Sequence, residues 1–266
     1  MQIVDGESDS EIGAHNTTIV SQFTKQAIPF KEMSQHSNHY GMNLMLKLSE
    51  PKQHDTVLDV ACGPGIVSCE FAKLVRYVKG IDLTPAMIEQ AKQLQKEKNL
   101  DNMEWEIGDV STLPFQDNEF SIVVTRYSLH HMINPNRVIK EMYRVCKPGG
   151  KILVVDVTPE KDKRELYNMV EKLRDPSHTE ALTLDELRLL LESESIIDIK
   201  TEHHDLEMKL EDILNASFPS PEDKKKILTL FKDDVINNNL GMNSQNRDGK
   251  IYFYFPISML IGFKPK

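Results

Sequence analysis

The most constraining feature of this 266-residue sequence is the regular alternation of short apolar runs and helical patterns between residues 56 and 157. Five runs are predicted to be strands, at residues 56–60, 77–81, 103–107, 120–125 and 151–157. Segments with helical spacing separate most of them, at 66–76, 85–98 and 135–146. Strands that alternate with helices of this length indicate βαβ units and a parallel sheet. The early runs are mostly apolar, as is typical of strands covered on both faces.

The segments on either side of this alternation are less regular. Residues 1–16 are polar and acidic, and we expect a flexible tail there. Residues 17–50 show helical spacing, with a break expected near Pro29. Residues 160–240 are expected to contribute inserted helices and a strand at 196–203.

The sequence therefore predicts a single domain over residues 17–266. Its core covers about residues 50–157, and lid or insert segments cover about 17–50 and 160–240. Residues 251–263 are rich in Tyr, Phe and Ile and are predicted to be the last strand. No clean crossover helix precedes that strand, so we expect it to be antiparallel beside the parallel part.

Charge and cysteine content limit the possible binding partners and the cellular compartment. The formal net charge is −9, and acidic residues flank both short basic clusters, at 161–164 and 224–226. Nucleic acid and anionic membrane are therefore disfavoured as partners. The three cysteines fit no zinc spacing, no signal peptide is recognised and no apolar stretch approaches the ~20 residues of a membrane span. These features predict a soluble protein of a reducing, cytoplasmic compartment, without a metal site.

A glycine turn follows the first predicted strand and carries the strongest motif. The strand ends at Ala61, and Gly63 and Gly65 open the next helix. Bare backbone at this point lets a ligand lie where a side chain would clash. In a parallel sheet that ligand lies outside the carboxyl ends of the strands. Asp59, just before the turn, is expected to attract a cationic ligand group.

Acidic residues also close the next two strands. Asp82 follows Gly63 by 19 residues, at a position suited to accept hydrogen bonds from both hydroxyls of a ribose. Gly108 and Asp109 follow the third strand, where the carboxylate can accept from an adenine amine and the N–H of Val110 can donate to a ring nitrogen. These strand ends together predict an adenosine site.

The same residues favour S-adenosylmethionine (SAM) over a nicotinamide dinucleotide. Ser68 stands where a dinucleotide fold usually has its third glycine. Asp59 would repel a pyrophosphate but attract a sulfonium or an ammonium. A nicotinamide-dependent oxidoreductase is therefore the less favoured alternative.

These motifs resemble those of class I SAM-dependent methyltransferases, and most closely the ubiquinone/menaquinone-biosynthesis-like and YcgJ-like group. The resemblance covers about residues 55–157 and extends more loosely through 172–178. It implies a Rossmann-like sheet of seven strands, mostly parallel with an antiparallel C-terminal strand, helices on both faces, and N-terminal and inserted lid helices. The resemblance rests on residues 57–65, 80–82, 108–109, 113–115, 128–131 and 147–150.

The resemblance also implies roles for individual residues. Asp59, Ala61, Gly63 and Gly65 would hold the methionine part of SAM. Asp82 would bind the ribose, Leu83 and Met87 would pack on the adenine, and Gly108, Asp109 and Val110 would lie at the adenine edge. The carbonyl of Arg126 would contact the methionine end. Phe23 and Phe30, with Ala27, resemble a helix that covers the site.

Several side chains have two open interpretations. His131 lies after the fourth strand, near the expected methyl group, and is the candidate general base; a structural role in the turn is equally open, and His130 is interpreted as structural. Tyr127 either lines the substrate entrance or packs in the core. Cys62 is interpreted as a small buried residue rather than a nucleophile.

Together these features predict methyl transfer to a small molecule by in-line displacement, with S-adenosylhomocysteine (SAH) as product. The alternatives are a non-catalytic SAM-binding protein and a protein methyltransferase. The sequence leaves open the identity of the acceptor, the methylated element and whether the chain is a monomer or a homodimer.

Overall fold

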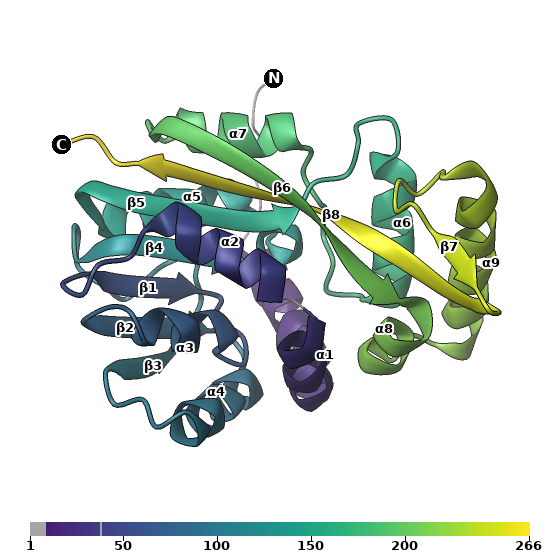
Figure 1. The fold of residues 1–266 in the computed structure, drawn as a ribbon, viewed down its shortest axis with the longest axis horizontal. Helices are drawn as coiled ribbons and strands as arrows, with labels where there is room; N and C mark the ends of the chain where they lie inside the picture. Colours follow the sequence, from purple (N-terminus) through teal and green to yellow (C-terminus); the bar gives the residue numbers. More distant parts are fainter. Residues whose placement is uncertain (1–8, 38) are drawn as a thin grey trace.

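A continuous mixed sheet forms the centre of the molecule, with strand order β3-β2-β1-β4-β5-β8-β6 (Figure 1). The computed structural model describes residues 9–37 and 39–266, with the side chains of residues 9, 30–37 and 39 outside this description. The strands are β1 (Thr56–Val60), β2 (Tyr77–Asp82), β3 (Met103–Ile107), β4 (Phe120–Arg126), β5 (Cys146–Val157), β6 (Ile197–Lys209), β7 (Gln245–Arg247) and β8 (Lys250–Phe263). Strands β1 to β5 are parallel, and β8 runs antiparallel to both β5 and β6.

Helices cover both faces of this sheet. They are α1 (Asp9–Ser37), α2 (His39–Ser49), α3 (Ile66–Ala72), α4 (Pro85–Glu97), the 3₁₀ turn η1 (Leu129–His131), α5 (Pro135–Val145), α6 (Arg164–Arg174), α7 (Leu184–Ser193), α8 (Leu210–Ser217) and α9 (Pro221–Asn237). One apolar core lies between the sheet and α2 and α3, and the other lies between the sheet and α5 and α7. Successive strand residues alternate between them: Val57 packs in the first core and Leu58 in the second. The predicted fold class is confirmed.

Local sequence signals explain where several helices begin. Pro85 and Pro135 occupy the first turns of α4 and α5, where the missing N–H has no helical partner in any case. The side chain of Asn134 accepts from the N–H of Arg137 and caps α5. Thr183 and Glu186 form a reciprocal capping box at the start of α7.

The N-terminal expectations need correction. Residues 9–16 belong to α1 rather than to a tail, because long-range hydrogen bonds hold this segment: His15 to the carbonyl of His131, and Asn16 to Asp109. Composition alone does not reveal such contacts. The helix also continues through Pro29, where a break was expected; one proline removes one helical hydrogen bond without ending the helix. The expectation for residues 1–8 lies outside the described residues.

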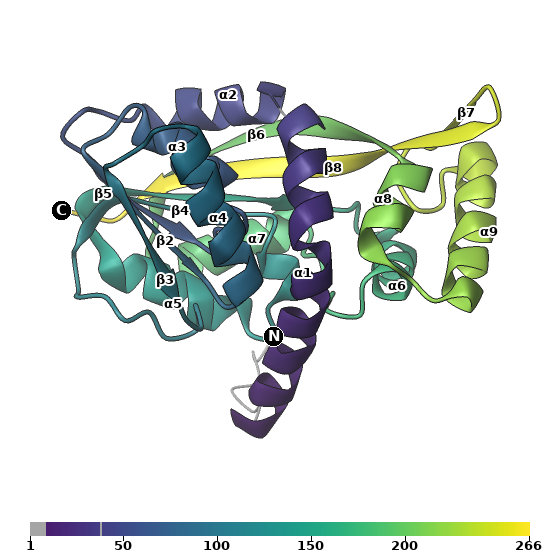
Figure 2. The same cartoon turned by 90° about the horizontal axis from the view of Figure 1, so that it is seen from below.

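The C-terminal strands position the second half of the chain. Strands β6 and β8 extend beyond the others and carry α8, α9 and the short β7, an eighth strand that the sequence did not predict (Figure 1). Helix α6 packs beside α9 at the same end. Helix α1 stands between this end and α4, and it contacts both α4 and α8 (Figure 2). The carboxyl ends of β1, β2 and β4 therefore lie beneath α1.

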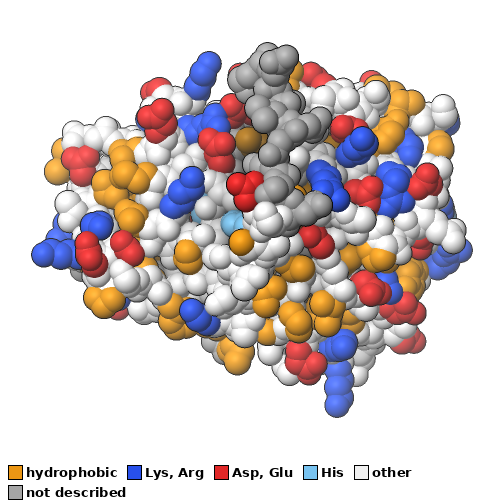
Figure 3. Space-filling view, turned by 180° about the vertical axis from the view of Figure 1, so that it is seen from behind, with side chains coloured by type: hydrophobic (Ala, Val, Ile, Leu, Met, Phe, Trp, Pro, Cys, Tyr) orange, Lys and Arg blue, Asp and Glu red, His pale blue; other side chains and the backbone are white. Residues whose placement is uncertain are grey.

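The surface carries charges of both signs. On the face shown in Figure 3, outside the grey atoms, Lys and Arg side chains alternate with Asp and Glu side chains. Among the described residues, no helix is long and apolar enough to cross a membrane.

Candidate functional site

A cavity opens at the carboxyl ends of β1, β2 and β4. Most of the predicted cofactor-site residues line it: Asp59, Ala61, Gly63, Asp82, Leu83, Met87, Asp109, Val110 and Arg126. Phe23, Tyr127 and His131, predicted to lie near the substrate, line the same cavity.

The two glycines of the turn after β1, Gly63 and Gly65, have different roles. Gly63 has φ +53°, and a Cβ there would meet no atom within 4 Å, so its backbone faces open space. Gly65 has φ +77°, and a Cβ there would lie 2.5 Å from the Trp105 ring and 2.9 Å from the Cβ of Ala91. Gly65 is therefore required by close packing, and it does not line the cavity. Only Gly63 has the open backbone that the motif suggests.

Asp59, the penultimate residue of β1, is almost completely buried. Its side chain is 1% exposed, and its Oδ2 accepts a hydrogen bond of 2.5 Å from the hydroxyl of Ser68. Burial raises the pKa of Asp59 to about 7, although the Ser68 hydrogen bond and the charge of Arg126 both act to lower it. In this state the carboxyl group is poised between its neutral and charged forms near neutral pH.

Asp82 ties the second strand to the glycine turn. Its Oδ2 accepts from the N–H of Gly63 and its Oδ1 from the N–H of Thr84, both at 2.8 Å. Burial nevertheless raises its pKa. Each carboxylate oxygen can accept more than one hydrogen bond, so Asp82 can bind a ligand hydroxyl while it holds the turn.

Asp109 lies at the same edge and is reached by helix α1. Its Oδ2 accepts from the Asn16 amide at 2.7 Å, and its Oδ1 accepts from the N–H of Ser111 at 2.8 Å. Gly108 does not line the cavity; a Cβ there would approach Ile81 at 3.2 Å. The carboxylate that was predicted to meet an adenine amine thus already accepts from one amide N–H.

The two adjacent histidines have different environments. His130 Nδ1 lies 2.5 Å from Asp156 Oδ1. Burial opposes the charging of His130, but the Asp156 carboxylate outweighs it and the pKa of His130 is raised. His131 Nδ1 lies 3.1 Å from the carbonyl oxygen of Ser177, which can only accept, so Nδ1 carries the proton. Among the described residues no hydrogen bond reaches His131 Nε2, which leaves its lone pair available.

His131 is held in its neutral form. Burial, followed by the nearby His130 charge, lowers the pKa of His131 to about 3. Phe23 of α1 packs edge-on against the His131 ring, with 4.9 Å between ring centroids. An unprotonated Nε2 on a ring that lines the cavity can accept a hydrogen bond from a bound molecule.

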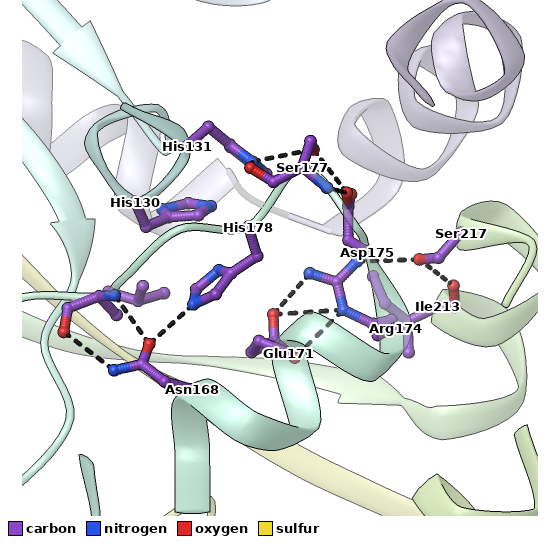
Figure 4. A network of polar contacts seen from close by, with 12 residues as sticks. His130, His131, Asn168, Glu171, Arg174, Asp175, Ser177, His178, Ile213 and Ser217 are labelled. Atoms are coloured by element: carbon purple, nitrogen blue, oxygen red, sulfur yellow. Dashed lines mark hydrogen bonds and ion pairs between the residues drawn. The ribbon is translucent and has the colours of Figure 1, made fainter. Parts of the chain in front are cut away.

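A buried polar network lies behind His131 (Figure 4). Ser177 Oγ lies 3.1 Å from His131 Nδ1 and donates to Asp175 Oδ1 at 2.5 Å. Gln26 of α1 donates to the other oxygen of Asp175 at 3.1 Å. Arg174 forms an ion pair with Glu171, with 2.5 Å between Nη2 and Oε2, and also donates to Ser217. The network thus joins α1, η1, α6 and α8.

Some residues of the cavity were not predicted. Asn16 and Ile19 of α1, Cys62, Pro64, Ile66 and Val67 around the glycine turn, and Ser128 and Met132 near η1 also line it. Asn16 lies three residues before Ile19, so the helical spacing could have been extended one turn towards the N-terminus. Cys62 is buried as predicted, and burial raises its pKa well above the ordinary value. The Phe30 side chain lies outside the described residues.

Comparison with known proteins identifies the fold and the family. A family model described as "Methyltransferase domain" matches residues 58–154. The uncharacterized methyltransferase YcgJ of Bacillus subtilis is 27% identical over 209 residues, which cover 78% of this chain and 83% of YcgJ. The crystal structure of YcgJ superimposes with a TM-score of 0.80, at 26% identity, and covers 86% of this chain and 100% of YcgJ.

Two further proteins share the same core. The ubiquinone/menaquinone biosynthesis C-methyltransferase UbiE of Ruegeria is 31% identical over 130 residues, which are 47% of this chain and about half, 52%, of that enzyme. Haemonchus contortus phosphoethanolamine N-methyltransferase 2, solved in complex with S-adenosyl-L-methionine, has a TM-score of 0.61 at 18% identity over 97% of this chain and 58% of its own, a likeness of fold alone. With the strand order, the glycine turn and the matched family model, these findings establish that the chain belongs to the class I SAM-dependent methyltransferases.

Proposed function

We propose that this methyltransferase binds SAM in the cavity beneath α1 and transfers its methyl group to a small molecule held in the same cavity. The observation that carries the proposal is the convergence of Asp59, Gly63, Asp82 and Asp109 on one cavity at the carboxyl ends of β1 to β3. Parallel sheets bind nucleosides at this edge. A cavity closed by α1 suits a small acceptor better than a protein substrate, which needs an open approach.

The residues present fit the cofactor. Open backbone at Gly63 leaves room for the methionine part, and the buried carboxyl of Asp59 offers a charge to its cationic groups. Asp82 would accept from the ribose hydroxyls. Leu83 and Met87 would pack on the adenine, and Val110 would donate its N–H to the ring. Asp109 would accept the adenine amine beside the amide of Asn16, or in its place.

The chain's contribution to chemistry is mainly positioning. Bound SAM supplies an activated methyl group and a neutral leaving group. The walls formed by Phe23, Tyr127 and His131 would hold the acceptor at ~3–3.5 Å from the methyl carbon and in line with the C–S bond. His131 Nε2 would accept a hydrogen bond from an O–H or N–H of the acceptor. Because its pKa is about 3, it would take the proton only as bond formation makes the acceptor strongly acidic.

The location of the protein forms part of the proposal. All three cysteines, Cys62, Cys69 and Cys146, are buried as free thiols. This supports a reducing compartment, and we propose the cytoplasm.

Isothermal titration of the purified chain with SAM, SAH and NADH tests the cofactor. We expect binding of SAM and SAH, and at 100 times Kd each should raise the free energy of unfolding by ~2.7 kcal/mol. Absence of heat with both ligands, on folded protein, would contradict the proposal. Transfer of labelled methyl to a metabolite extract tests the reaction, and the extract's protein fraction tests the protein-substrate alternative.

Replacing His131 tests its part in that reaction. If the hydrogen bond to Nε2 matters, His131→Ala should lower kcat/KM by ~10²-fold while leaving SAM affinity unchanged. A loss smaller than about threefold would remove His131 from the mechanism.

A further inference from the structure

Arg126 brings a positive charge into the cavity, where its guanidinium lies over the Tyr127 ring at 4.9 Å from the ring centroid. It ends β4 and lines the cavity, and its Nη1 is buried without a hydrogen-bond partner. Within the described part of the chain, no ion pair involves this guanidinium. Asp59 is near enough to feel its charge, but the Asp59 carboxyl bonds to Ser68. A buried donor of a charged group that lacks an acceptor is costly, so a ligand acceptor would be favoured here.

The register of the sheet shows what shares the face with Arg126. Arg126 is opposite Val155 of β5. Two residues further along, Val157 is opposite Ile257 of β8, and Ile257 is opposite His204 of β6. Paired residues of neighbouring strands point to the same face, and residues two apart in one strand do so too. Arg126 and His204 therefore lie on the same face of the sheet.

His204 lies on this face outside the lining of the cavity, with its ring centroid 6.1 Å from that of Tyr40. Both of its ring nitrogens are buried and make no hydrogen bond. Burial lowers the pKa of His204, and the Arg126 charge lowers it further, so the ring is neutral and still has one N–H to donate. Two donors without a hydrogen-bond partner thus extend from β4 towards β6.

The strand order indicates which ligand would meet Arg126. In the order β3-β2-β1-β4-β5-β8-β6, the residues assigned to adenosine end β2 and follow β3, on one side of β1. Arg126 and His204 lie on the other side of β1, beyond the expected methionine end of the cofactor. This step rests on the proposed function, because it takes the cofactor's orientation from it. A sulfonium between the two sides would also attract an anion.

We propose that the methyl acceptor is a small-molecule acid whose carboxylate is bound by Arg126. A planar carboxylate matches the geometry of a guanidinium and would satisfy the buried Nη1. The competing occupant of Arg126 is the carboxylate of the cofactor's own methionine part. The two occupants predict different structures.

Crystals of the full chain grown with SAH and soaked in sodium bromide distinguish them, since bromide is an anion located by its anomalous scattering. We expect SAH in the cavity with its carboxylate away from Arg126, and bromide at ~3.5 Å or less from Arg126 Nη1. SAH carboxylate on Nη1 would overturn the inference, as would bound SAH with no bromide at Nη1. A cavity without SAH would instead overturn the proposed function.

Variants give the matched control. Arg126→Met should abolish the bromide peak, and Arg126→Lys should retain it. Arg188→Met, which alters an arginine of α7 bonded to Thr201 outside the cavity, should leave the peak unchanged. A peak that persists in Arg126→Met would contradict the assignment. If Arg126→Met does not fold, the wild-type and Arg126→Lys crystals still decide the question.

Discussion

The two halves of the molecule use buried polar groups in opposite ways. In residues 56–157, Asp59, Asp82 and Asp109 are held by one or two local hydrogen bonds and still line the cavity. In residues 158–266, Glu171 and Arg174 pair with each other and line no part of it. The three carboxylates of the first half stay available for a ligand, whereas the Glu171–Arg174 pair of the second half fixes helix α6. Shared cofactor chemistry and acceptor choice can therefore change independently in such a fold.

Helix α1 connects the two halves. Asn16 bonds to Asp109 of the first half, and Gln22 donates to the Ser217 carbonyl of the second at 2.8 Å. Gln26 donates to Asp175, beside the residues that hold His131. The same helix therefore contacts the Asp109 side of the cavity and the network behind its far wall.

The largest expected effect comes from breaking the ion pair of the second half. Arg174→Met leaves Glu171 buried without its partner, and the free energy of unfolding should fall by ~3–5 kcal/mol. Chemical denaturation measures this loss. SAM affinity, measured by calorimetry on folded protein, should change little, because Arg174 does not line the cavity.

A double variant provides the control. Replacing both partners, as Glu171→Leu with Arg174→Met, removes the uncompensated charge and should recover most of the lost stability. If the double variant is no more stable than Arg174→Met alone, the ion pair contributes to the free energy of unfolding by more than compensating two buried charges.

In the first half, Asp82→Ala should act on ligand binding. Removing a charged acceptor from the ribose should weaken SAM by roughly 1–3 kcal/mol, measured by calorimetry. Asp82→Asn keeps one acceptor oxygen and should weaken SAM less. Unchanged affinity in Asp82→Ala would mean that the ribose lies elsewhere.

The sequence predicts the first half well for a physical reason. Strands β1, β2, β4 and β5 are mostly buried, so their apolar runs are visible, and the helices between the strands have clear spacing. Asp59, Gly63 and Asp82 follow directly from these strand ends, because parallel strands place their carboxyl ends at one edge. Cavity residues of this half could therefore be predicted before any contact was known.

The second half could not be predicted to the same depth. Arg174, Asp175 and Ser177 belong to a segment that shows only a helix end and a turn, and nothing in its spacing reveals that the side chains are buried. Their partners come from α1 and α8, far away in the chain. Asn16 was missed for the same reason, since a polar N-terminal composition resembles a tail.

An intermediate effect should appear in the pH dependence of SAM binding. The pKa of Asp59 is raised to about 7, and a cationic ligand prefers the charged form. SAM affinity should therefore rise by about tenfold from pH 6 to pH 8 if only the charged form binds. Asp59→Asn should remove this rise, and because the ligand's own amino group titrates equally in both proteins, the difference between them isolates Asp59.

In the cofactor-free protein, the contribution of Asp59 to the free energy of unfolding should fall as the pH rises, opposite to the change in SAM affinity. A carboxyl whose pKa is raised on folding contributes stability below its unfolded pKa, near 3.8, and loses it as the pH rises through about 7. The free energy of unfolding of the wild type, relative to Asp59→Asn, should therefore decline between pH 4 and pH 7. A relative decline on lowering the pH instead would contradict the raised pKa.

The smallest effect should come from Ser177→Ala, where the second half meets the cavity. The change removes the hydroxyl between Asp175 and His131, but the Ser177 carbonyl still accepts the Nδ1 proton. Unfolding free energy should fall by roughly 0.5–1.5 kcal/mol, and turnover should fall about threefold as His131 becomes less fixed, with SAM affinity unchanged. Ser193→Ala, which loses a hydroxyl bonded to the Leu190 carbonyl at the end of α7, is the matched control and should leave turnover intact. A loss of SAM affinity in Ser177→Ala, without a change in turnover, would mean that the network supports the cofactor rather than His131, and the division between the two halves would no longer hold.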